Sequence, residues 1–144
     1  MLFIFIGIQF IQPKANKGQA ATNQDISHYV EVPGHIQNIL KASCYDCHSN
    51  HTNYPWYASI NPLGLWLDHH IREGKEELNF SDFSRYDKKK LDHKLEETLE
   101  EVQEGHMPLP AYLWLHDEAK LNQHQINQVV AWVKNERRKL AVAK

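Results

Sequence analysis

The stretch Cys44-Tyr45-Asp46-Cys47-His48 holds the only two cysteines of this 144-residue chain, and a histidine follows the second cysteine directly. C-x-x-C-H is the attachment motif of c-type haem, in which two thiols add to the vinyl groups of a porphyrin and the adjacent imidazole binds the iron. On a helical turn, residues three apart lie on one side, so both thiols can meet one edge of the ring while His48 faces its centre. We therefore predict one covalent haem c per chain, attached at Cys44 and Cys47, with His48 as an iron ligand.

The length, charge and cysteine content of the chain exclude several classes of protein. A chain of this length predicts one domain with a core of its own. The formal net charge of -2 implies no basic surface, which argues against nucleic acid as a partner. Two cysteines at this spacing do not make a disulfide framework. Thioether attachment of haem takes place outside the cytoplasm in bacteria, so the motif also predicts a periplasmic protein.

The chain opens with an apolar run from Met1 to Ile11. The run is short for a membrane span but suits the core of a signal peptide or the end of an anchor. No Lys or Arg precedes it, so we expect either a start further upstream or a trimmed chain. We assign residues 1–12 to a signal peptide or membrane anchor, through which the protein can attach to the inner membrane.

The next segment, residues 13–31, is polar and contains Pro13 and Gly18. This composition predicts a flexible linker, followed by a haem-binding domain over residues 32–144. Within the linker, Gly18-Gln19-Ala20 before Ala21 weakly resembles a signal-peptide cleavage site.

Helical periodicity predicts that the domain is all-α. Four helices are expected, at residues 33–43, from Asn61-Pro62 to Gly74, at residues 87–104, and from Asn122 to the C-terminus. Their expected start and stop signals are Asn61 as an N-cap, Gly74 as a stop, Asp87 as an N-cap, Gly105 as a stop, and a capping box of Asn122 with Gln125. Phe80 and Phe83, in the segment between the second and third helices, are expected to be buried.

A methionine follows the third expected helix in the loop His106-Met107-Pro108. Met107 is the only methionine besides Met1, and a thioether is a soft, neutral ligand that favours ferrous iron and raises the reduction potential. Proline restricts the backbone of its predecessor, which holds the sulfur in place. We predict Met107 as the second axial ligand. The alternatives are His106 or another histidine, an open or water-bound position, and Met107 as a flexible core filler.

An aromatic cluster, Tyr54, Trp56 and Tyr57, surrounds Pro55 downstream of the motif. These rings can simply fill the core, or they can wall the porphyrin, with a phenol or an indole N–H free to bond a propionate. Both roles are compatible, and we predict all three as haem-contacting residues. A second aromatic block at residues 112–115 is expected beside the haem edge.

The ordered set of motifs resembles the bacterial haem-binding domain family of small, single-haem, c-type cytochrome-like proteins. The resemblance covers residues 32–140 and implies an all-α, cytochrome c-like fold around one covalent haem. It also implies thioether bonds at Cys44 and Cys47, proximal His48 and distal Met107. It is carried by Cys44-x-x-Cys47-His48-Ser49, Thr52-x-Tyr54-Pro55-Trp56-Tyr57, Leu78-Asn79-Phe80-Ser81, Gly105-x-Met107-Pro108 and the closing helix with Trp132.

Three functions are compatible with these residues. The leading hypothesis is a non-enzymatic electron carrier that exchanges single electrons with a redox partner protein at the haem edge. The second is a haem-based peroxidase or a gas or redox sensor, in which Met107 is displaced and His51, His69 or His106 donates a proton. The third is a zinc or dithiol site built on the two cysteines.

Overall fold

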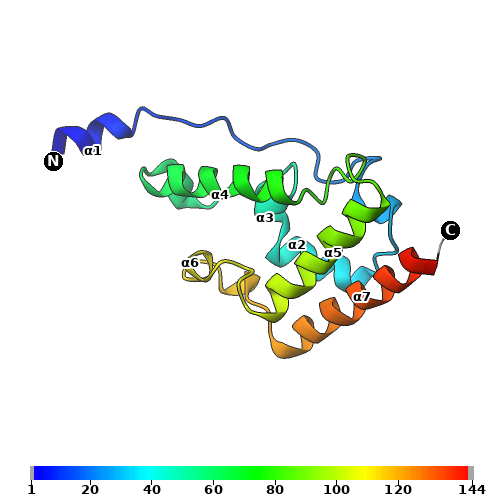
Figure 1. The fold of residues 1–144 in the computed structure, drawn as a ribbon. Coiled ribbons are helices and arrows are strands. Elements are labelled where there is room, and N and C mark those ends of the chain that lie inside the picture. Colours follow the sequence, from blue (N-terminus) through cyan, green and yellow to red (C-terminus); the bar gives the residue numbers. More distant parts are fainter. Residues whose placement is uncertain (1, 143–144) are drawn as a thin grey trace.

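A computed structural model describes residues 2–142, which form seven α-helices and three 3-10 helices with no β-strand (Figure 1). The all-α prediction is therefore confirmed. No helix within this range is long and apolar enough to cross a membrane. The helices are α1 Leu2–Ile8, η1 Ile26–His28, α2 Gly34–Ser43, α3 Tyr45–His48, η2 Trp56–Ser59, α4 Leu63–Glu77, α5 Lys88–Gln103, α6 Pro110–Leu113, η3 Asp117–Ala119 and α7 Gln123–Val142.

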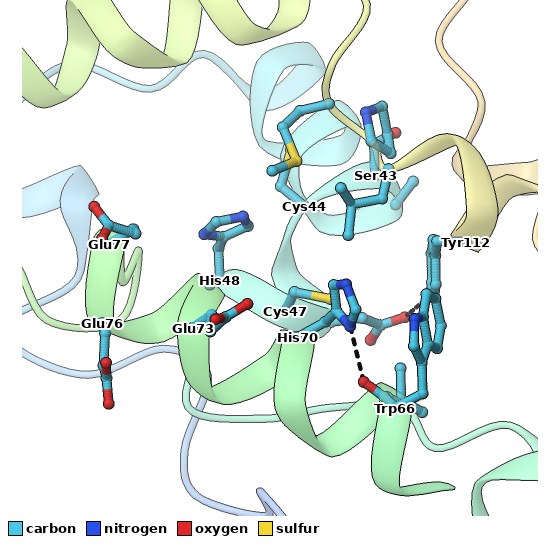
Figure 2. A pocket seen from close by; sticks show the side chains of 17 residues that line it. Ser43, Cys44, Cys47, His48, Trp66, His70, Glu73, Glu76, Glu77 and Tyr112 are labelled. Carbon is cyan, nitrogen blue, oxygen red and sulfur yellow. Dashed lines mark hydrogen bonds between the residues drawn. The ribbon is translucent and has the colours of Figure 1, made fainter. Parts of the chain in front are cut away.

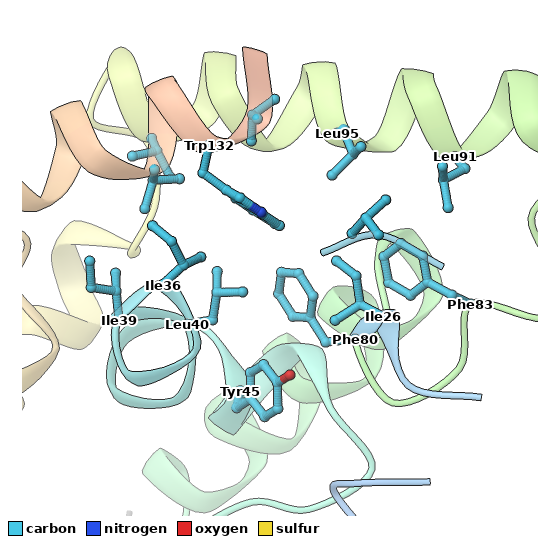
Figure 3. Close-up of a cluster of buried hydrophobic side chains, with 14 of the residues drawn as sticks. Ile26, Ile36, Ile39, Leu40, Tyr45, Phe80, Phe83, Leu91, Leu95 and Trp132 are labelled. Carbon is cyan, nitrogen blue, oxygen red and sulfur yellow. The ribbon is translucent and has the colours of Figure 1, made fainter. Parts of the chain in front are cut away.

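The larger of two hydrophobic cores lies where α2 faces α5 and α7 (Figure 3). Phe80 and Phe83 enter it from the segment after α4, at 2% and 1% exposure, as the sequence predicted. The indole of Trp132 packs in the same core and donates its N–H to the Glu31 carbonyl at 2.8 Å. Burial of these large apolar side chains is the main stabilising contribution of the fold.

The pair α5 and α7 forms the most extensive helix contact, and charged groups join the two helices at its edge. Arg137 donates to both carboxylate oxygens of Asp92, at 2.8 and 3.0 Å, and to Glu96 at 2.8 Å. A two-pronged contact of this kind uses the planar geometry of the guanidinium. Asp92 and Glu96 therefore take part in the contact between the two helices.

Most helix ends follow the predicted signals. The Asp87 carboxylate accepts the Lys90 N–H at 2.8 Å, which caps α5. Gly105, at φ 75°, lies just beyond the end of this helix. At the start of α7, Asn122 and Gln125 exchange two side-chain-to-backbone hydrogen bonds of 2.9 Å, which is the predicted capping box.

The boundaries predicted for α4 were wrong at both ends. The helix begins at Leu63 without a side-chain cap, and Asn61 lies buried with its amide bonded to Ile8 and Ile11 carbonyls. It continues past Gly74 to Glu77. A Cβ on Gly74 would lie 3.0 Å from the Cys47 carbonyl oxygen, so this glycine serves the close approach of α3 rather than the end of α4.

The expected linker over residues 13–31 is packed on the domain instead of forming a free tether. The Asn16 side chain donates to the Thr52 hydroxyl at 2.9 Å, and the Thr52 N–H donates to the Asn16 carbonyl at 3.0 Å. Further along, the Ile26 side chain is 1% exposed in the larger core, and its N–H donates to the Phe80 carbonyl at 2.9 Å. A polar composition did not reveal these long-range contacts.

Two glycine substitutions test the packing around α4. In Gly64→Ala, the new Cβ would lie 2.2 Å from the backbone carbonyl oxygen of Ala58 in η2, which cannot move independently of its helix. We expect a loss of about 1–3 kcal/mol in the free energy of unfolding, measured by urea denaturation. Gly34→Ala is the matched control, because its Cβ meets nothing within 4 Å, and it should be neutral or stabilise by up to about 1 kcal/mol. Equal stability of the two variants would contradict the packing described.

Candidate functional site

Cys44, Cys47, His48 and Met107 line one cavity of about 430 Å³ (Figure 2). This volume is within the range of small-molecule and cofactor sites. A second cavity of about 320 Å³ adjoins it, and Cys44, His48 and Met107 line both. The structure therefore brings together the four residues that the sequence assigned to haem attachment and iron ligation, although they lie up to 63 positions apart in the chain.

The imidazole of His48 is held in one orientation by the backbone that follows α4. Its Nδ1 lies 3.0 Å from the Leu78 carbonyl oxygen, and because a carbonyl only accepts, Nδ1 carries the proton. Burial lowers the pKa of His48, so the ring is neutral at pH 7. The lone pair on Nε2 is thus available to a metal, and a carbonyl partner on the other nitrogen is the usual support of a metal-binding histidine.

The environment of the two thiols does not suit a redox dithiol. Burial raises the pKa of Cys44 to about 12, and burial together with the Asp46 charge raises that of Cys47 to about 11. Reactive C-x-x-C thiols have lowered pKa values, because the thiolate is the nucleophile. The zinc alternative also lacks a ligand set, since no three His, Cys, Asp or Glu side chains converge on a metal position among residues 2–142.

Met107 reaches the cavity because of the way α5 ends. The Glu101 carbonyl accepts the N–H groups of both His106 and Met107, at 3.0 and 3.1 Å, which folds the loop back after Gly105. Met107 is partly buried, whereas His106 is exposed beside Glu101 and Glu104. The loop therefore directs the thioether residue, and not its histidine neighbour, to the cavity wall.

The three aromatic residues predicted to contact haem do not line either cavity. Tyr57 is buried in the second core, with Leu67, Ile71, Tyr112 and Ala119. The other two lie elsewhere: the Tyr54 hydroxyl accepts the Asn16 N–H, and the Trp56 ring is 75% exposed.

The rings on the cavity wall are those of Trp66 and Tyr112. Tyr112 belongs to the aromatic block that the sequence analysis placed beside the haem edge. In the sequence, Trp66 belongs to the apolar face of the second expected helix. Helical periodicity does not distinguish a core residue on such a face from a residue that lines a cavity.

Asp46, a variable position of the motif, joins the site to its surroundings. One carboxylate oxygen accepts the Asn53 N–H and the other accepts the Tyr112 hydroxyl, both at 3.0 Å. Its backbone carbonyl accepts the Thr52 hydroxyl at 2.6 Å. No local pattern in the sequence marks this role of Asp46, because each of its partners lies outside the motif.

Tyr112 is braced from behind by a polar chain that includes the buried residues Tyr57 and His116. Its ring stacks on His116 at 4.0 Å between centroids. His116 accepts the Tyr57 hydroxyl proton at Nε2 and donates from Nδ1 to Glu118, both at 2.9 Å. These contacts keep one wall of the cavity rigid, because every polar member of the chain is satisfied.

The histidine that lines the cavity besides His48 is His70. Its Nδ1 donates to the Trp66 carbonyl at 2.8 Å, and its ring lies 4.4 Å from the Trp66 ring (Figure 2). The histidines proposed from the sequence as proton donors lie outside the cavity lining: His51 bonds to the Gly18 carbonyl, His69 pairs with Glu73, and His106 is exposed.

Residues 3–135 match the family model described as haem-binding domain. The matched region includes the C-x-x-C-H motif, Met107 and most of α7, and it also includes the N-terminal segment before residue 32. No curated protein and no solved structure matches the chain.

We expect the Tyr112 hydroxyl to make the free energy of unfolding depend on pH in the alkaline range. Burial and the Asp46 charge raise the pKa of Tyr112 above its ordinary value of 10.0, so the folded state holds this proton more tightly than the unfolded state. The contribution of Tyr112 to the free energy of unfolding is fully present below about pH 10. It is lost as the pH rises further, by up to about 1.4 kcal/mol per pH unit. Tyr112→Phe should cost about 1–2 kcal/mol at pH 7 and make the alkaline fall shallower.

Urea denaturation of the haem-loaded protein between pH 7 and 11 measures both effects. Tyr29→Phe is the control, because that ring is 39% exposed. A Tyr112→Phe variant with the same alkaline slope as wild type would contradict the role given to this hydroxyl.

Proposed function

The chain belongs to the haem-binding domain family, and we propose that it is a monohaem, c-type cytochrome-like protein that carries single electrons in the periplasm. The observation that carries the proposal is the placing of His48. Its neutral, partly buried imidazole is anchored through Nδ1 on the Leu78 carbonyl and shares a cavity with Cys44 and Cys47. The periplasmic location follows from the chemistry proposed, because thioether attachment takes place outside the cytoplasm.

The donor set fits a c-type haem. Cys44 and Cys47 would hold it through thioether bonds, and His48 Nε2 and the Met107 sulfur would bind its iron. When bound, the haem supplies one-electron chemistry at its iron. The protein orients the imidazole through Leu78 and offers apolar walls from Leu67 and Leu109, which exclude water.

A cytochrome c-like topology is part of the same proposal. It is supported by the order of the elements, in which α2 leads directly into the motif and the loop with Met107 follows a long helix. The terminal helix α7 contacts α2 as well as α5, which is the arrangement expected of such a fold.

Met107 favours electron transfer over catalysis. With a thioether and an imidazole both bound, the iron would keep no free position for a substrate. The soft sulfur would also favour the ferrous state and raise the reduction potential.

The redox partner is expected to carry a basic surface. Glu73, Glu76 and Glu77 of α4 line the cavity that holds the motif, as Figure 2 shows. Glu97 and Glu101 of α5 line the adjoining cavity, where Lys94 pairs with Glu77 and Glu97 and still leaves an excess of negative charge. Charges of one sign around a reactive site steer oppositely charged partners and raise the association rate.

A haem-based peroxidase or gas sensor is the second candidate, and His70 is the observation that favours it. Nδ1 of His70 is engaged by the Trp66 carbonyl, so its Nε2 could hold or deliver a proton within the cavity. This function would require Met107 to leave the iron easily.

Carbon monoxide distinguishes the two functions in protein produced with the machinery for c-type maturation. Wild type should have a low-spin visible spectrum and should not bind the gas when reduced. Met107→Ala should bind carbon monoxide readily and have a more negative reduction potential, because the thioether is lost. Leu115→Ala, an apolar truncation outside both cavities, is the control and should behave as wild type. Tight binding by wild type would favour the second candidate.

A further inference from the structure

The N-terminal helix presents an apolar surface that the described part of the chain does not cover. None of the side chains in α1 is buried, and Phe3 and Phe10 are 87% and 82% exposed. Residues 1–13 carry no charged side chain, and Lys14 and Lys17 are the only charged side chains before Asp25. A segment that is apolar all round is stable in an apolar environment, and two lysines at its end suit anionic lipid headgroups.

The end of this segment is clamped to the start of α4 by Asn61, which is 2% exposed. The Asn61 side-chain amide donates to the carbonyls of Ile8 and Ile11, at 2.6 and 2.8 Å. The Gln9 side chain donates to the Asn61 carbonyl at 2.9 Å and accepts the Asn61 N–H at 3.0 Å. Four hydrogen bonds therefore hold α1 in one place, at the end of the molecule where α4 begins (Figure 1).

A second attachment lies at Asn16, before the weak cleavage signal. Its side chain donates to the Ser49 carbonyl and the Thr52 hydroxyl, both at 2.9 Å, and accepts from Lys75 at 2.8 Å. Ser49 and Thr52 are 0% and 3% exposed. Cleavage after Ala20 would remove Asn16 and leave buried polar groups without their partners, which is costly.

Further exposed apolar side chains lie on the domain side of the clamp, near Asn61 in the sequence. Ile60 and Leu63, which flank Asn61, are 40% and 44% exposed, and Trp56 at the start of η2 is 75% exposed. Tryptophan is the residue most typical of the boundary between lipid and water. The apolar surface is thus formed by α1 together with Trp56, Ile60 and Leu63, and we name it the N-terminal face.

We propose that residues 2–12 remain on the mature protein and insert into an anionic lipid surface, and that Asn61 couples them to the domain so that the whole N-terminal face lies on the bilayer. The inference rests on the export assumed in the proposed function and adds an orientation to it. Trp66 and His70, on the cavity wall, lie about 5 and 10 Å along α4 from Leu63. The haem cavity would then be held close to the membrane surface.

The first test is the intact mass of the haem-loaded protein purified from the cell envelope. We expect a mass that includes residues 2–16. A mature N-terminus at Ala21, or at any other position after residue 2, would overturn the proposal. The visible spectrum of the same sample reports haem separately, so loss of the segment and failure of the proposed function give different results.

The second test is flotation with vesicles of phosphatidylethanolamine and phosphatidylglycerol. Wild type should bind, and the double variant Phe3→Glu/Phe10→Glu should bind at least about tenfold more weakly, because both side chains insert. Val142→Glu is the matched control: Val142 is 81% exposed at the opposite end of the molecule, and its change should leave binding within about twofold. Absent binding by wild type, or equal loss in the control, would overturn the proposal.

The third test asks whether Asn61 transmits the orientation. Trp56→Glu should weaken vesicle binding about tenfold in the wild-type background and less than about twofold in Asn61→Ala, where the domain can turn away from the lipid. Gln9→Ala breaks the clamp from its more exposed side and serves if Asn61→Ala folds poorly. Equal effects of Trp56→Glu in all backgrounds, or no effect in any, would overturn the coupling.

Discussion

The close contact between α3 and α4 at Gly74 is the constraint on which the rest of the site depends. Because Gly74 has no side chain, the Cys47 backbone can lie directly against the helix. The segment that leaves α4 then bonds His48 twice: the Leu78 carbonyl accepts from the imidazole, and the Phe80 N–H donates to the His48 carbonyl at 2.8 Å. One packing contact therefore sets both the position of the motif and the orientation of its imidazole.

The opposite wall of the cavity has a separate origin. Met107 comes from the end of α5, and this helix is held by the larger core and by the Arg137 contacts with α7. The site thus forms where the end of α5 meets the motif, and the core that holds α5 also contains Tyr45 and Phe80. Asp46 adds a polar link from the motif to α6 through Tyr112, so the wall between them is also held in place.

Features that depend on local chemistry could be predicted from the sequence. The C-x-x-C-H motif, the caps at Asp87 and Asn122, and the burial of Phe80 and Phe83 each follow from short-range patterns. Features that depend on distant partners could not. Asparagine is a residue type typical of an N-cap, but the side-chain amide of Asn61 donates to carbonyls about 50 positions earlier in the chain.

Two other differences between the predictions and the structure also arise from contacts between residues that are distant in the chain. The polar segment before residue 32 resembles a linker, yet its polar groups are bonded to the loop that follows the motif. The aromatic residues after the motif are as suitable for a core as for a haem wall, and the fold uses Tyr57 in the core and Trp66 at the cavity. The hydrophobic pattern of a sequence predicts which residues are buried, but it does not predict whether a buried ring faces the core or a cavity.

Covalent attachment of haem at Cys44 and Cys47, with His48 as a ligand of the iron, can be measured by the mass of the denatured protein after production with c-type maturation machinery. We expect a mass increase of one haem that survives unfolding and extraction with acidified solvent, and that is lost in Cys44→Ser/Cys47→Ser. A wild-type chain that keeps no haem after this treatment would show that the two cysteines do not attach it.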